Sequence, residues 1–409
     1  MASTSKTAVG SRAFVATPRN APCAKKVQAT HKATPKRGAV LRAVAEDTTE
    51  VDVDAAKGYI KTEDFPAMSN IESYAEDTSV GGSEQRILFV VPGGVGEALH
   101  FLPIIETVAK DLPNAALDIV AAPRACTTFE LCPYVRNTHP FDVEGSPLSD
   151  EATDVLGILK GDYYTSVVSA LPAGLNQAVY YWLASSTNLV GYVKDQKTGY
   201  ALDAFAKFFF NAPVFPETGD VSTLGCSAYD KLLETLMPGY EKEAVKVGVP
   251  PAAATWAEGV CAELGLAAGQ FVLAHGVPSD SAAAMSMAGD TAGSSLPLES
   301  WAEFAASSSM PVLFATPRED ASAAVAEAIP GAKVVIANNP SKLAALVSAA
   351  GKVASANTAA VPLAGYLSTP AAAAFSSYET GVTFTSAYTN VTAVSGADAT
   401  GKGLADALN

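Results

Sequence analysis

The sequence predicts an α/β fold made of two Rossmann-like, doubly wound domains that face each other across a cleft. From residue 86 onward, short apolar runs alternate with helical patterns, which is typical of parallel βα units. The alternation occurs in two series of similar size, joined by a Pro- and Ala-rich segment near residues 249–254. In paired domains of this kind, ligands bind between the carboxyl ends of the two sheets.

The first series predicts a sheet that is closed by its strand at residues 188–193. Earlier strands are expected at residues 87–91, 117–120, 134–143 and 164–171, and helices from Leu99 through Val108, at 126–131 and at 175–184. The stretch 199–237 then looks helical. We expect the aromatic side chains of this half to be buried, namely Tyr163, Tyr164, Tyr180, Tyr181, Phe205, Phe208, Phe209 and Phe210. Were some of them exposed together, they would mark a partner interface.

The second series repeats the pattern after residue 254. Strands are expected at residues 271–274, 312–315, 334–337 and 352–354, and helices at 255–264, 298–307, 321–328 and 342–349. Residues 277–295 contain few large side chains and many Ser, Ala, Gly and Met residues. This composition predicts a loop over the cleft.

The first 45 residues differ from the rest, because they are basic and contain no acid before Glu46. A basic start rich in Ser, Thr and Ala is typical of an organelle transit peptide, here of the chloroplast type; the alternative is a disordered basic arm. We therefore expect a chloroplast transit peptide at 1–45, a flexible acidic linker at 46–84, a first domain at 85–240, an interdomain linker and helix at 241–265, and a second domain at 266–409.

The remaining chain is strongly acidic. Removing the nine positive charges of the leader takes the formal net charge from −15 to −24. A nucleic-acid partner is therefore not expected, because no basic surface remains to replace phosphate counterions. No apolar stretch is long enough to span a membrane, whereas peripheral attachment through an amphipathic surface stays open.

The cysteines favour neither a metal site nor a disulfide framework. The chain has five, Cys23 among them in the leader, and they form no C-x-x-C pair. Cys126 and Cys132 could meet across a turn, but we expect buried free thiols. No metal and no cofactor are expected.

The stretch RILFVVPGGVGEALHFLP, residues 86–103, predicts a strand, a glycine turn and the start of a helix. Gly93, Gly94 and Gly96 allow the tight turn, and the free N–H groups with the helix dipole favour an anion. Glu97 lies at the first helical turn, over the carboxyl end of the sheet. His100 lies one turn later, either as an acid–base partner of Glu97 or packed near the cleft.

Three segments carry a family resemblance: GGVGEALHFLPIIETVAKDLPNAALDIVAAP (93–123), GDYYTSVVSALPAGLNQAVYYWLASSTNLVGYV (161–193) and SKLAALVSAAGKVASANTAAVPLAGYLSTPAAAAF (341–375). In this order they resemble the heptosyltransferase-type glycosyltransferases of family 9. The resemblance covers most of the chain after residue 85 and implies the GT-B architecture of two facing Rossmann-like domains. It further implies an acceptor side in the first domain and a donor-nucleotide side in the second.

The positions that would carry the chemistry depart from the family pattern. Glu97 stands where the family has the Asp that serves as catalytic base. In the late turn, Asn357 replaces an Asp, Thr358 is kept and Ala359 replaces a Gly. The turn after the strand at 271–274 keeps Gly276, but the cationic element that follows in the family has become Ser-Ser-Leu-Pro at 294–297.

These changes predict a GT-B protein whose transferase activity is lost or reduced. It would act as a structural or assembly subunit of a photosynthetic complex, in the chloroplast stroma or on the stromal face of the thylakoid, with a protein partner. The alternative is an active inverting glycosyltransferase, in which Glu97 is the base, His100 its neighbour, and Gly93, Gly94, Gly96, Gly276, Asn357 and Thr358 hold a nucleotide-sugar phosphate. A dinucleotide-dependent oxidoreductase fits poorly, because PGGVGE lacks the G-x-G-x-x-G spacing.

Overall fold

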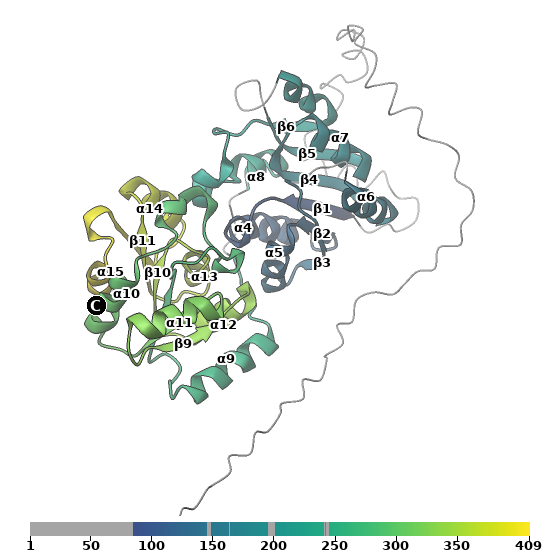
Figure 1. Cartoon of the computed structure of the whole chain (residues 1–409). Helices are drawn as coiled ribbons and strands as arrows, with labels where there is room; N and C mark the ends of the chain where they lie inside the picture. Colours follow the sequence, from purple (N-terminus) through teal and green to yellow (C-terminus); the bar gives the residue numbers. More distant parts are fainter. Residues whose placement is uncertain (1–84, 145–148, 163, 195–200, 241, 243–244) are drawn as a thin grey trace, which may run out of the picture. The chain divides into compact units, whose positions relative to one another are not determined.

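The computed structural model describes residues 85–409, apart from 145–148, 163, 195–200, 241 and 243–244 (Figure 1). The expected transit peptide, the expected acidic linker and Tyr163 lie outside the described residues. Two parallel six-stranded sheets with flanking helices form two Rossmann-like domains, which confirms the predicted fold class. The domain bounds that we expect stay a prediction.

The first sheet has the strand order β3-β2-β1-β4-β5-β6. Its strands are β1 (Arg86–Val91), β2 (Ala116–Ala121), β3 (Val135–Pro140), β4 (Tyr164–Ala173), β5 (Ser185–Val193) and β6 (Ala212–Val214). Its helices are α4 (Val95–Asp111), α5 (Pro123–Cys126), α6 (Asp150–Asp162), α7 (Leu175–Ala184) and α8 (Asp230–Leu236), with 3-10 helices η3 (Thr127–Leu131), η4 (Ala201–Phe209) and η5 (Val221–Ser227). The order reverses between β1 and β4, which is where such folds bind ligands.

The second sheet has the order β12-β11-β10-β7-β8-β9, the same topology counted from its own first strand. Its strands are β7 (Val272–His275), β8 (Val312–Thr316), β9 (Lys333–Ile336), β10 (Lys352–Ala356), β11 (Ala371–Phe375) and β12 (Val391–Ser395). Its helices are α9 (Pro251–Glu263), α10 (Leu298–Ser307), α11 (Glu319–Ala328), α12 (Pro340–Ala349), α13 (Ala360–Tyr366), α14 (Tyr378–Thr385) and α15 (Gly401–Leu408), with η6 (Ala282–Ala284), η7 (Ala288–Gly293) and η8 (Gly396–Asp398). Here the order reverses between β7 and β10.

The largest apolar cluster joins the two domains. It contains buried residues of α4, such as Leu99 and Leu102, together with residues of α12 and α13, such as Leu346 and Leu363. The Tyr366 hydroxyl of α13 donates a hydrogen bond of 2.9 Å to the Leu99 carbonyl of α4. Apolar burial and this hydrogen bond therefore hold α4 against the second domain.

Two expectations for the first domain are wrong. The sheet does not end at residue 193, because β6 pairs with β5 as a further edge strand. Its Pro213 lacks an N–H group, which suits an edge strand. Phe205 is 39% exposed, and Phe208 and Phe209 are only half-buried, whereas Phe210 is buried. In the 3-10 helix η4, side chains three residues apart share a face, so Phe205 and Phe208 lie together on the outer side.

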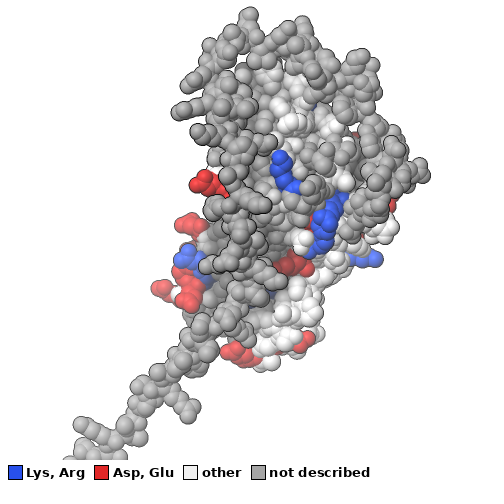
Figure 2. Space-filling view, turned by 90° about the vertical axis from the view of Figure 1, so that its right-hand side faces the viewer, with Lys and Arg blue, Asp and Glu red and all other residues white. Residues whose placement is uncertain are grey.

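Charges of both signs lie on the molecular surface. On the face shown in Figure 2, the described Lys and Arg side chains lie among Asp and Glu side chains. Among the helices that the structure describes, none is both long and apolar enough to cross a membrane.

Candidate functional site

Glu97 holds the first turn of α4 together. Gly93, with φ of 80°, lets the chain leave β1 and turn into the helix. The Gly94 N–H then donates a 2.8 Å hydrogen bond to Oε2 of Glu97. This contact satisfies an N–H group that the helix start leaves free. One oxygen of the candidate base therefore caps its own helix.

The other oxygen of Glu97 reaches the second domain. Oε1 accepts a hydrogen bond of 3.1 Å from the Ala288 N–H, at the start of η7. The side chain is 7% exposed. Both carboxylate oxygens of Glu97 thus accept backbone N–H groups, and the residue links the two domains.

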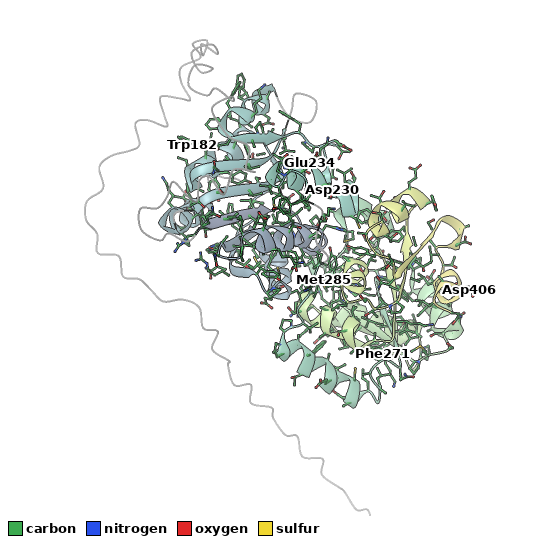
Figure 3. All side chains as sticks on the ribbon, turned by 180° about the vertical axis from the view of Figure 1, so that it is seen from behind. Trp182, Asp230, Glu234, Phe271, Met285 and Asp406 are labelled. Atoms are coloured by element: carbon green, nitrogen blue, oxygen red, sulfur yellow. The ribbon has the colours of Figure 1, made fainter. Side chains whose placement is uncertain are left out.

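Residues 284–294, which we call the strap, carry Ala288. Six strap residues are buried around the two 3-10 helices, namely Ala284, Met285, Met287, Asp290, Gly293 and Ser294. Met285 has φ of 54°, an unusual left-handed conformation for a residue with a side chain. In place of the loop expected at 277–295, the structure has the two short 3-10 helices η6 and η7. Met285, labelled in Figure 3, and Met287 bury their side chains, whereas Ala288, Thr291 and Ala292 stay exposed.

Backbone carbonyls of the strap accept hydrogen bonds from N–H groups of the turn that follows β10. The Asn357 N–H donates to the Gly293 carbonyl at 2.8 Å, and the Ala359 N–H donates to the Met285 carbonyl at 2.9 Å. Ser286 and Thr358 form an antiparallel bridge between these two bonds. The N–H groups of Asn357 and Ala359, at the topological switch point of the second sheet, therefore already have partners within the chain.

Thr358 faces the neighbouring strand. Its Oγ1 lies 2.7 Å from Nδ1 of His275, at the end of β7, and 3.0 Å from Oγ of Ser355. Burial lowers the pKa of His275 to about 4, so the imidazole is neutral at physiological pH. The Gly276 carbonyl accepts hydrogen bonds from Leu296 N–H and from Nε1 of Trp301. Thr358, His275 and the Gly276 carbonyl therefore all have hydrogen-bond partners within the chain.

Asn357 contacts a buried acid of the strap. Its Nδ2 donates to Oδ2 of Asp290 at 3.2 Å, while its Oδ1 has no hydrogen-bond partner. The same Asp290 accepts from Gly293 N–H at 3.1 Å and from Ser376 N–H at 3.4 Å. The sequence carries no signal for Asp290, because it lies in a segment of small residues without a hydrophobic period.

His100 packs beside Phe384 of α14, with ring centroids 5.8 Å apart. Its Nε2 is buried without a hydrogen-bond partner. Burial, helped by the positive charge of Lys242, lowers the pKa of His100 to about 4. The bonds of Glu97 are to Gly94 and Ala288, so the geometry matches the packed arrangement for His100.

A cavity of about 380 Å³ remains at the switch point of the first sheet. Among the described residues, its wall includes Gly93 and Glu97 after β1, Leu171 of β4, the acids Glu144 and Asp220, and the cation Lys194. Burial raises the pKa of Glu144, and the charges of Asp142 and Glu97 act in the same direction, against Arg124. The cavity wall is thus predominantly acidic, which disfavours an anionic ligand.

The structure brings the predicted site residues into two groups. Gly93, Gly94, Gly96 and Glu97 surround the start of α4, and a second group, formed by Gly276, Asn357 and Thr358, surrounds the turn after β10. Within the described part of the chain, no three His, Cys, Asp or Glu residues cluster as metal ligands would. The strap lies between the two groups, through its bonds to Glu97 and Asn357.

Comparison with known proteins gives one sequence relative and several structural ones. The chain is 30% identical over 340 residues to the photosynthetic NDH subunit of subcomplex B 1, chloroplastic, of Arabidopsis thaliana, covering 81% of this chain and 72% of the relative. No family model matches the chain.

Among the structural relatives are two heptosyltransferases of E. coli. E. coli heptosyltransferase WaaC, solved with ADP, is 18% identical with a TM-score of 0.56, over 79% of this chain and 97% of that one. E. coli ADP-heptose heptosyltransferase II is 13% identical with a TM-score of 0.60, over 80% and 98%. At these identities the likeness concerns the fold, and it confirms the predicted GT-B, heptosyltransferase-like architecture.

Proposed function

We propose, on the premise that this chain belongs to the family of the photosynthetic NDH subunit of subcomplex B 1, that it serves as a structural or assembly subunit of that photosynthetic complex. It would act in the chloroplast, in the stroma or on the stromal face of the thylakoid, with transferase activity lost or reduced. The relative's name gives the complex and the compartment. The loss of catalysis is supported by the turn after β10, whose N–H groups are bonded to the strap.

The observation that carries this proposal is the strap. The N–H groups of Asn357 and Ala359 donate to strap carbonyls, and Glu97 accepts a bond from strap residue Ala288. A nucleotide diphosphate needs free donors at such a turn. To bind one here, the chain would first have to break these bonds and expose Met285 and Met287.

Charge supports the same conclusion. The cavity that remains has Glu97, Glu144 and Asp220 in its wall and a single cation, Lys194, in the part that the structure describes. A diphosphate leaving group is stabilised by positive groups or by a metal ion. The cavity wall would instead repel it.

An apolar patch supplies a surface for a partner. It consists of Trp182 and Leu183 of α7 with Leu202 and Phe205 of η4, which are 53%, 37%, 65% and 39% exposed. Figure 3 shows Trp182 at the periphery of the first domain. The rings are held by neighbours, since Trp182 lies 6.2 Å from Phe209 and Phe205 lies 6.1 Å from Phe208. Clusters of exposed aromatic side chains typically mark protein interfaces.

The charges around the patch favour a different protein as the occupant. Lys207, whose Nζ lies 5.2 Å from the Phe208 ring centroid, is exposed beside it. A second copy of the chain would bring two Lys207 side chains together. An anionic membrane would repel a chain of net charge −15. A different protein with an apolar surface and one carboxylate facing Lys207 avoids the paired lysines, and its overall charge need not be negative.

The test is association with the complex together with donor binding. We expect the tagged protein to migrate with the NDH complex on native gels, identified by its other subunits, and to show no heat of binding with ADP- or UDP-sugars. A protein that stays monomeric in the presence of the complex would overturn the proposal.

The competing function is an active inverting glycosyltransferase. It is favoured by Glu97, a carboxylate at the wall of a cavity of about 380 Å³. Saturable, micromolar binding of a nucleotide sugar, with transfer that Glu97→Gln abolishes, would establish it in place of our proposal.

A further inference from the structure

Asp290 is a buried acid whose neighbours resemble an anion site. It is 5% exposed, and its two oxygens accept bonds from Gly293 N–H, from Ser376 N–H and from Nδ2 of Asn357. These donors belong to η7, to the segment between β11 and α14, and to the turn after β10. Donors from three separate elements thus converge on one carboxylate.

The donor set suits a small anion. All three donors are neutral N–H groups, and no Lys or Arg contacts Asp290 in the described part of the chain. Three N–H donors can stabilise one buried negative charge. A diphosphate would bring more charge than these donors offset.

The space at the site fits the carboxylate closely. A Cβ atom added to Gly293 would lie 2.2 Å from Oδ2 of Asp290, so a side chain there would displace the acid. Oδ1 of Asn357, fully buried, has no hydrogen-bond partner and is a further acceptor at the site. A protonated phosphate oxygen could donate to it, which the Asp290 carboxylate cannot do.

We propose that Asp290 is an internal anion, which occupies an anion-binding site at the switch point of the second sheet. Without this side chain, the site would accept a small free anion such as formate, acetate or inorganic phosphate. The inference deepens the proposed function and rests on it. A site that the Asp290 carboxylate fills explains how the strap stays bound in a protein that uses no nucleotide-sugar donor.

The test is chemical rescue of Asp290→Ala in the full chain, followed by the melting temperature. We expect the variant to melt several degrees below wild type, and sodium formate, acetate or phosphate to restore at least half of that difference. Sodium chloride at the same ionic strength should not. Asp280→Ala, at an exposed position shortly before the strap, is the matched control and should respond to none of them.

Two results would overturn the inference: an unchanged melting temperature, or a lowered one that no anion restores. Should Asp290→Ala not fold, Asp290→Ser keeps a small acceptor for Gly293 N–H, and the same rescue is measured. Failure of the inference leaves migration with the complex untouched. Failure of the proposed function would appear separately, as nucleotide-sugar binding by the wild-type protein.

Discussion

The sulfur of Met287 fills the space beside Gly96, so that a Cβ atom added to Gly96 would lie 2.2 Å from Sδ. Gly96 belongs to the first turn of α4 and Met287 to the strap, so the two domains meet at this contact. Gly96 therefore leaves room for the Met287 side chain of the strap. The sequence indicated only its role in the geometry of the turn.

Gly96→Ala should destabilise the protein. The methyl group would collide with Met287, and overpacking of this kind costs about 1–3 kcal/mol. This cost exceeds the gain in helix propensity when alanine replaces glycine. Denaturant unfolding measures the loss. In a Met287→Ala background the cost should shrink, because the collision is gone.

Gly157→Ala on α6 is the matched control, since nothing lies within 4 Å of a Cβ added there. It should leave stability unchanged or raise it by up to about 1 kcal/mol. Equal effects of the two substitutions would contradict the strap contact.

Glu97→Gln should loosen the strap. A glutamine amide offers one acceptor in place of two, and its NH₂ group would face either Gly94 N–H or Ala288 N–H. The unmade bond should cost about 1–3 kcal/mol, and hydrogen exchange of the Ala288 amide should accelerate.

Glu303→Gln is a suitable comparison, because Glu303 also accepts one backbone N–H, that of Lys402, but at an exposed position. Its effect should stay within about 0.5 kcal/mol. If Glu97→Gln leaves both stability and exchange unchanged, the structural role of Glu97 is wrong.

The sequence predicts the parts of the fold whose hydrophobic period is clear. The change from an apolar run to helical spacing locates β1 and α4, and the bounds expected for α7 and α10 match the structure. β11 reads AAAAF and is buried at all five positions, yet alanine has no preference for strands. Such a strand forms because its neighbours β10 and β12 pair with it.

The candidate site is predictable only in part, for a similar reason. Glu97, Asn357 and Thr358 follow strands, so topology places them at carboxyl ends. Asp290 and Met287 belong to a segment of small residues, and tertiary contacts with Asn357 and Gly96 decide where they lie. Sequence pattern alone does not contain those contacts.

Acid should destabilise the protein through two buried histidines. Burial lowers the pKa of both His100 and His275 to about 4, against 6.5 for the ordinary side chain. The unfolded chain therefore binds these protons more tightly, and stability present above pH 6.5 is lost as the pH falls toward 4. At pH 5 each histidine should cost about 2 kcal/mol relative to pH 8.

His100→Leu isolates one of the two contributions. Leucine cannot be protonated, and it removes the buried Nε2 that has no hydrogen-bond partner. Unfolding measured at pH 8 and pH 5 should show a smaller difference for the variant than for wild type, by about 2 kcal/mol. Identical pH dependence of the two proteins would exclude His100 as a source of acid sensitivity.

Substitutions in the apolar patch should weaken association with the complex and leave the fold intact. Trp182→Ser and Leu202→Ser remove exposed apolar side chains, so the melting temperature should hardly change. Central aromatic residues of an interface contribute about 2 kcal/mol or more, so Trp182→Ser should lower affinity about thirtyfold. Tyr378→Ser, at an aromatic residue that is 75% exposed on α14, is the control and should bind normally.

Two further experiments test the other occupants of the apolar patch: sedimentation of the protein alone tests a second copy, and flotation with anionic vesicles tests the membrane. A dimer or a vesicle complex that Trp182→Ser abolishes, with binding to the NDH complex unchanged, would assign the patch to a second copy or to the membrane instead.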